Sequence, residues 1–175
     1  MYLLYKMSNI TEAFKLLGIA DPTALSVNLP IIYQKLILSN FEYAKANVNN
    51  PVMIINLCEQ PLQSNSNNSL IYNFKLDDSD SIPYHYFKGI MVQCAHLIKM
   101  AVDNKYPVIV NCAAGINRSS SAVVAYSILA RKLKVDDAIG YIKHMKAQKY
   151  GNRWPTLTNY KFVEYLKRME SELVN

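Results

Sequence analysis

The sequence has few of the residues that would staple a fold or build a metal site. Its 175 residues contain three cysteines, Cys58, Cys94 and Cys112, which lie far apart and form no CxxC pair. This pattern argues against a disulfide scaffold and a zinc site and favours a reducing compartment, so we expect a cytoplasmic protein, with the nucleus as the alternative. The three histidines also lack the spacing of metal ligands. We therefore expect no metal and no cofactor.

Long apolar runs are missing as well. The sequence has no run of about eighteen apolar residues, and residues 1–7 are too short, with the wrong flanks, for a signal peptide. We therefore expect no membrane partner. The formal charge of +6 would suit an anionic substrate through electrostatic steering, but a lysine-rich surface that only maintains solubility explains it equally well.

Residues 1–28 are expected to form an N-terminal segment with one short amphipathic helix. Apolar residues from Ile10 to Leu17 fall at helical spacing, and Gly18 follows as a stop signal. The apolar stripe of this helix can pack on the rest of the chain or on a second subunit. A homodimer through the N-terminal helix is therefore one of two arrangements that the pattern allows.

Residues 29–175 are expected to form one domain in which strands alternate with helices. Apolar runs predict strands over 31–38, 51–57, 71–76 and 108–111. Helical spacing and end signals predict helices over 84–103, 117–133, 136–149 and 158–170, with Asp136 capping the third of these. This alternation predicts an α/β fold with a central, mostly parallel sheet flanked by helices.

The segment 108–119 is the most informative part of the chain. An apolar strand runs into Cys112, a short loop with Gly115 follows, and Arg118 leads into a helix. Loop amides at a helix N-terminus bind anions, and the planar arginine fork can hold two phosphate oxygens at once. The residues expected to bind phosphate are Ala113, Ala114, Gly115, Ile116, Asn117 and Arg118.

The same segment predicts covalent chemistry. A thiol at a helix N-terminus beside a cation has a lowered pKa, so Cys112 is expected to attack phosphorus as a thiolate and form a phospho-cysteine. Arg118 would stabilise the transition state, and the Ser119 hydroxyl would stabilise the sulfur as it leaves. The segment therefore predicts a cysteine-dependent phosphatase. Cys58 is expected in the core, with a resolving thiol for oxidised Cys112 as the alternative.

Residues 111–120 and the following 122–126 form a signature that extends beyond the nucleophile. Together with 36–40, 54–57 and 158–162, they resemble the dual-specificity protein phosphatases of the protein-tyrosine-phosphatase superfamily. The resemblance implies the fold of that superfamily and a phosphoprotein substrate, dephosphorylated at tyrosine and at serine or threonine. The Ile-Asn-Arg run before Ser119 is also similar to some viral members of the family.

A phosphatase of this kind needs a proton donor for the leaving oxygen. Counted back from the Tyr-Phe pair of the helix over 84–103, Asp77 aligns with the general acid of the family that the chain resembles. Asp78 is its nearest rival, and Asp80 also fits a cap for that helix. Three aspartates within four residues are equally ordinary in a solvated loop.

Asn111 departs from the family pattern, which has histidine directly before the nucleophile. Asparagine can hydrogen-bond but carries no charge, so there are two hypotheses: a slower enzyme with a less depressed thiol pKa, or a silent module that binds phosphate. We favour activity because Cys112, Arg118, Ser119 and an acid are all present. An RNA 5′-phosphatase is a further alternative, since superfamily members with that activity have a similar Ile-Asn-Arg run; otherwise we expect no nucleic-acid partner.

Overall fold

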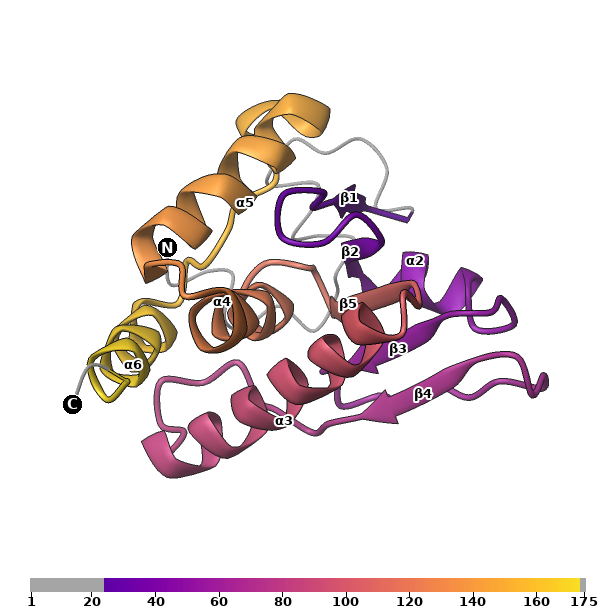
Figure 1. Cartoon of the computed structure of the whole chain (residues 1–175), viewed down its shortest axis with the longest axis horizontal. Helices are drawn as coiled ribbons and strands as arrows, with labels where there is room; N and C mark the ends of the chain where they lie inside the picture. The colour runs from indigo at the N-terminus through magenta and orange to yellow at the C-terminus, as the bar shows by residue number, and fades with distance from the viewer. Residues whose placement is uncertain (1–23, 174–175) are drawn as a thin grey trace.

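A five-stranded sheet lies at the centre of the structure, a computed structural model that describes residues 24–173 (Figure 1). The sheet has the order β1-β2-β5-β3-β4. Its strands are β1 (Ser26–Asn28), β2 (Leu36–Asn40), β3 (Met53–Asn56), β4 (Leu70–Asn73) and β5 (Val108–Cys112). β1 runs antiparallel to β2, and every other pair of neighbours is parallel. The expected α/β fold with a mostly parallel sheet is confirmed.

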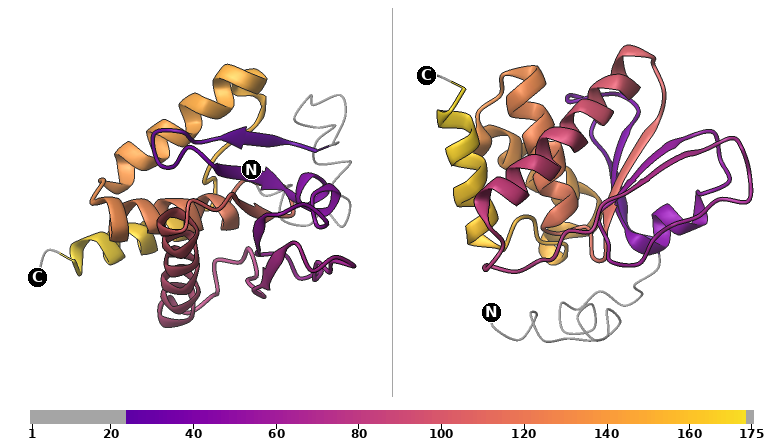
Figure 2. Two further views of the ribbon diagram at one scale, coloured as in Figure 1. Left: turned by 45° about the vertical axis from the view of Figure 1, so that its right-hand side comes forward. Right: turned by 90° about the horizontal axis from the view of Figure 1, so that it is seen from below.

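Helices cover both faces of the sheet, which explains why its central strands are continuous apolar runs. α2 (Phe41–Ala46) lies on one face. The other face carries a layer of helices: α3 (Tyr84–Asp103), α4 (Arg118–Arg131), α5 (Val135–Tyr150) and α6 (Tyr160–Ser171), with the short helix η2 (Gly151–Arg153) between the last two. The view from below in Figure 2 shows α2 and this layer on opposite sides of the strands.

The two faces have separate apolar cores. Val108 and Val110 of β5 point into the larger core under α3 to α6, and Ile109 between them points into the smaller core under α2. α4 lies in the middle of the helical layer, in contact with α3, α5 and α6, and its residues 119–128 are all buried. The loop between β5 and α4 is therefore anchored on one side by a strand that is buried throughout and on the other by the buried residues 119–128 of α4.

The element boundaries differ from the prediction in the first part of the domain. The strand expected over 31–38 begins only at Leu36, because Leu29 O accepts hydrogen bonds from Ile32 N and Tyr33 N and closes a turn before it. Ile31 is consequently exposed. α2 was not predicted, since its six residues are too few to show a helical period. Its N-cap is Asn40, whose side chain accepts a hydrogen bond from Tyr43 N.

Two helix starts are also corrected. α5 begins at Val135 with Lys134 as N-cap, so Asp136 lies in the first turn and does not cap the helix. α6 begins at Tyr160, two residues later than expected, because the Asn159 side chain accepts hydrogen bonds from the N–H groups of the next turn. The helix expected over 84–103 has these bounds in the structure.

The N-terminal part of the chain is described only from residue 24. The helix expected over 10–17, and with it the homodimer prediction, lies outside the described residues. Residues 26–28, which the sequence assigned to the N-terminal segment, form β1 and pair with β2 of the domain. Within residues 24–173, no helix has the length and apolar character needed to cross a bilayer.

Candidate active site

The predicted phosphate loop leaves the sheet at the carboxyl end of its central strand. Cys112 is the last residue of β5, Arg118 is the first residue of α4, and the loop joins them over 113–117. Gly115 adopts φ of +68°, and a Cβ built there would lie 2.6 Å from a Trp154 ring carbon and 2.8 Å from Ser39 O. Glycine is therefore required at this position for both its conformation and its size.

The carbonyl groups of residues 113–116 are all held from outside the loop. Phe41 N donates to Ala113 O at 3.2 Å, and Leu157 N donates to Ile116 O at 3.0 Å. Trp154 Nε1 donates to Ala114 O at 2.9 Å, and Lys146 Nζ donates to Gly115 O at 2.6 Å. In a trans peptide the N–H points opposite to the C=O, so the N–H groups of residues 114–117 face away from these partners. Such a row of N–H groups forms an anion-binding concavity.

The thiol of Cys112 is buried and activated. Ser119 Oγ donates a hydrogen bond to Cys112 Sγ at 3.3 Å. Burial by itself raises the pKa of the Cys112 thiol, but the Arg118 guanidinium and the hydrogen bonds from the Ser119 hydroxyl and backbone N–H outweigh it, and the pKa is lowered. The structure thus gives Cys112 and Ser119 the contacts expected of a thiolate and its hydrogen-bond donor.

The Arg118 side chain is fixed by backbone carbonyls. Its Nη1 donates to Leu57 O at 3.2 Å and to Leu76 O at 3.1 Å, so the ends of two neighbouring segments orient the guanidinium. Its Nε is buried and has no hydrogen-bond partner among the described residues. A buried cationic donor of this kind is satisfied by an anion, which agrees with the expected phosphate site.

The three aspartates of the segment 77–80, which precedes α3, differ in their exposure and contacts. Asp78 is half-buried, and its carboxylate accepts hydrogen bonds from Asn117 Nδ2 at 3.1 and 3.2 Å and from Asn159 Nδ2 at 3.1 Å. Asp77, which the resemblance aligned with the acid, is exposed, although its charge still acts on Arg118. Asp80 is exposed and does not cap α3, whose N-cap is Pro83. The structure therefore joins Asp78, and not Asp77, to the phosphate loop.

Asn111 belongs to a ladder of asparagines that sequence reasoning missed. Its side chain is fully buried, and its Nδ2 donates to Asn56 Oδ1 at 2.8 Å. Asn56 Nδ2 in turn donates to Asn73 Oδ1 at 2.8 Å. The three residues are register partners near the carboxyl ends of β5, β3 and β4. The signal was present in the sequence, because each of these strands has an asparagine as its last residue or directly before it.

Lys146 is the second unexpected member of the site. It lies on α5 with none of its side chain exposed, and its spacing from Ile139 and Ile142 is that of an apolar stripe. A lysine at a position where the helical spacing predicts an apolar residue was the signal in the sequence that Lys146 has a special role. Trp154 packs against Gly115, and its Nε1 donates a hydrogen bond to the loop. Among residues 24–173, no three His, Cys, Asp or Glu side chains gather as a metal site would require.

Comparison with known proteins agrees with this geometry. Residues 36–171 match the family model of the dual specificity phosphatase catalytic domain. The protein 123R of Invertebrate iridescent virus 6, named as a tyrosine phosphatase, is 28% identical in an alignment 99 residues long that covers 50% of this chain and 67% of the viral protein.

Solved structures show the same fold at low identity. Human DUSP28 superposes with a TM-score of 0.64 and 18% identity over 89% of this chain and 97% of its own. OH1 from the Orf virus, described as a tyrosine phosphatase, superposes with a TM-score of 0.62 and 19% identity over 91% of this chain and 95% of its own. The resemblance read from 111–120 thus holds over nearly the whole domain, and the chain belongs to the dual specificity phosphatase family.

Proposed function

We propose that this chain hydrolyses phosphate monoesters on proteins, at phosphotyrosine and also at phosphoserine or phosphothreonine. The observation that carries the proposal is the position of Cys112, a buried thiol at the end of β5 that accepts a hydrogen bond from the Ser119 hydroxyl at 3.3 Å and on which the charge of Arg118 acts. Burial without such partners makes a cysteine inert. Membership of the dual specificity phosphatase family supports a phosphorylated substrate.

In the first step the Cys112 thiolate attacks phosphorus in line with the leaving oxygen. The S–P bond forms, the P–O bond to the substrate breaks, and a carboxylic acid gives its proton to the departing oxygen. Arg118 and the N–H groups of residues 114–117 bind the other phosphate oxygens, and they stabilise the charge that gathers there in the transition state.

We assign the proton donor to Asp78. Its carboxyl group is hydrogen-bonded to Asn117 of the phosphate loop, and its charge acts on both Cys112 and Arg118. A general acid must lie within reach of the leaving oxygen, so contact with the loop favours Asp78 over the exposed Asp77. The family alignment favours Asp77 as the general acid. The variants Asp78→Asn and Asp77→Asn distinguish the two assignments.

In the second step water attacks the phospho-cysteine. The S–P bond breaks, the same carboxylate takes the proton of the water, and inorganic phosphate leaves. The hydrogen bond from Ser119 Oγ stabilises Cys112 as it departs as a thiolate, because a charged acceptor gains more from that bond than a neutral one.

The test is phosphate release from three substrates: a phosphotyrosine peptide, a phosphothreonine peptide and 5′-triphosphorylated RNA. We expect turnover of the peptides and its loss in Cys112→Ser. Activity that survives in this variant would remove Cys112 as nucleophile, and turnover of RNA alone would give the function to the RNA 5′-phosphatases. Binding of phosphopeptide with no turnover of any substrate would identify a silent module.

A further inference from the structure

Lys146 is a buried cation directly behind the phosphate loop. Its Nζ lies 2.6 Å from Gly115 O, 3.1 Å from Pro155 O and 3.5 Å from Ser120 Oγ, so each of its three N–H bonds has an acceptor. The same atom lies 4.3 Å from the centre of the Trp154 ring. The groups in contact with the ammonium are thus neutral, two carbonyls, a hydroxyl and an aromatic face.

A buried ammonium is costly, and a methionine would fill the same space without that cost. The contacts of Lys146 offset part of the cost, but they do not explain why a charge stands here. The pKa of Lys146 is lowered to about 7, because burial lowers it by more than the negative charge of Cys112 raises it. This attraction acts in both directions, so the charged lysine also favours the Cys112 thiolate.

The contact with Gly115 O decides the direction of one peptide group of the loop. With the carbonyl held by Lys146, the N–H of Ile116 must point to the opposite side, where the anion would bind. Trp154 acts in the same way one residue earlier: its Nε1 holds Ala114 O, which turns the N–H of Gly115 to that side. Gly115 at a positive φ has no side chain to resist other conformations, so these two outside contacts determine its orientation.

We propose that Lys146 is a positioning residue for the phosphate site, which fixes the N–H group of Ile116 toward the anion and adds positive charge close to Cys112. This role rests on the proposed function only in its consequence for turnover. It supplies a charge near the nucleophile in a chain whose residue 111 is a neutral asparagine. Lys146 acts on the phosphate only through the loop, because it contacts the loop on the side opposite to the N–H groups.

The experiment compares Lys146→Met with wild type by two measurements that need no turnover. The rate of Cys112 carboxymethylation by iodoacetate, followed against pH, gives the thiol pKa, and protection by inorganic phosphate gives the affinity of the loop for the dianion. We expect the alkylation midpoint of Lys146→Met to move to higher pH, and protection by phosphate to weaken about tenfold, as loss of one aligned donor and one charge predicts.

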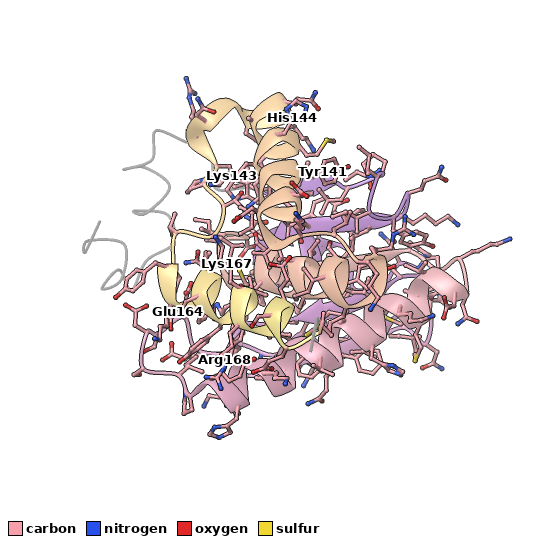
Figure 3. All side chains as sticks on the ribbon, turned by 60° about the vertical axis from the view of Figure 1, so that its left-hand side comes forward. Tyr141, Lys143, His144, Glu164, Lys167 and Arg168 are labelled. Carbon is pink, nitrogen blue, oxygen red and sulfur yellow. The ribbon has the colours of Figure 1, made fainter. Side chains whose placement is uncertain are left out.

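Lys143→Met is the matched control, because Lys143 lies three residues earlier on α5 and is exposed (Figure 3). It should leave both measurements unchanged. If the two methionine variants behave alike, the effect is one of general charge and the proposal fails. It also fails if Lys146→Met folds with the midpoint and the phosphate affinity of wild type. A purely structural role would lower the melting temperature without moving the thiol pKa.

If Lys146→Met does not fold, Lys146→Gln is measured in the same way, since an amide retains a donor for Gly115 O and lacks the charge. An unchanged alkylation midpoint in folded Lys146→Gln would contradict the electrostatic part of the proposal. Wild-type protein that binds phosphate but turns over no substrate would contradict the proposed function, whereas the role of Lys146 would still be decided by alkylation and protection.

Discussion

Two buried cysteines lie at the carboxyl ends of neighbouring parallel strands, and the pKa values of their thiols are shifted in opposite directions. Cys58 lies just beyond β3, and its pKa is raised to about 12, mainly by burial and further by the nearby Cys112. Cys112 ends β5, is at least as buried, and has a lowered pKa. Burial therefore does not decide which thiol reacts. The segment after the strand does: beyond β5 the chain forms a loop of aligned N–H groups and enters α4 with Arg118 and Ser119.

The largest effect is expected when each cysteine is replaced by serine. Cys112→Ser should lower phosphatase activity by about a thousandfold or more, because a hydroxyl at this position is a far weaker nucleophile. Cys58→Ser should leave activity within about threefold of wild type, because Cys58 serves the smaller core. Initial rates on a phosphotyrosine peptide check both. Equal losses in the two variants would show that the thiols act as a pair.

The second test replaces the planar guanidinium group of Arg118 with a lysine ammonium group. Arg118→Lys retains the charge but not the planar fork, so we expect kcat to fall by about a hundredfold or more. The Cys112 thiol pKa should stay close to that of wild type, because the influence by which Arg118 lowers it is coulombic and lysine retains the charge. Iodoacetate alkylation across pH reports this pKa. A midpoint that moves to clearly higher pH would mean that the planar guanidinium, and not its charge alone, lowers the thiol pKa.

The third test separates the two aspartates. Asp78→Asn should lower turnover of a phosphotyrosine peptide by about a hundredfold, within the usual range for a general acid, and should spare activated aryl phosphates. Asp77→Asn is the matched control, with the same chemical change one residue earlier on an exposed side chain. If Asp77→Asn shows the larger, leaving-group-dependent loss, the family alignment is right and our assignment is wrong.

The fourth test concerns pH. The thiolate is the reactive form, so alkylation of Cys112 should increase as pH rises through its lowered pKa and level off above it. Ser119→Ala should move this midpoint upward and slow the second step about tenfold, since a hydrogen bond to a charged group is lost. Cys58 should stay unmodified across the neutral range. Modification of Cys58 near pH 7 would break the comparison.

The smallest expected effect comes from Asn111, whose Nδ2 lies 2.8 Å from Asn56 Oδ1 and 3.7 Å from Cys58 Sγ. Asn111→His would place a titratable cation beside the Cys58 thiol and one residue before Cys112, and we expect a gain of about threefold in turnover below about pH 6.5, where histidine is charged. The pH–rate profile on an aryl phosphate measures this. An identical profile would show that residue 111 does not tune the nucleophile.

The part of the molecule that could be predicted from sequence is the part determined by local patterns. The phosphate loop over 113–117 lies between a continuous apolar strand and a helix, and the residue order shows both. Lys146 and Asn56 could not be assigned, because their role depends on which strands and helices pack together. The strand expected over 31–38 failed for a related reason: Ile31 and Ile32 have strand propensity, but backbone hydrogen bonds to Leu29 O form a turn there.

The aspartates of residues 77–80 show a related limit. The family pattern predicts Asp77 as the acid, and that assignment stays a prediction. The contacts of Asp78 with Asn117 and Asn159, which are 39 and 81 residues away along the chain, could not be predicted from sequence. Adjacent aspartates in a loop have the same local signals. Only the packing of the α6 N-terminus against the phosphate loop separates them.

The four contacts that hold the loop carbonyls also have a consequence for biosynthesis. One comes from Phe41, but the other three come from residues 146, 154 and 157, which leave the ribosome after the loop itself. A nascent chain that ends before residue 146 contains Cys112 and Arg118 but lacks three of the four groups that orient the loop. The row of loop N–H groups can therefore be aligned only after residues 146–157 have been synthesised.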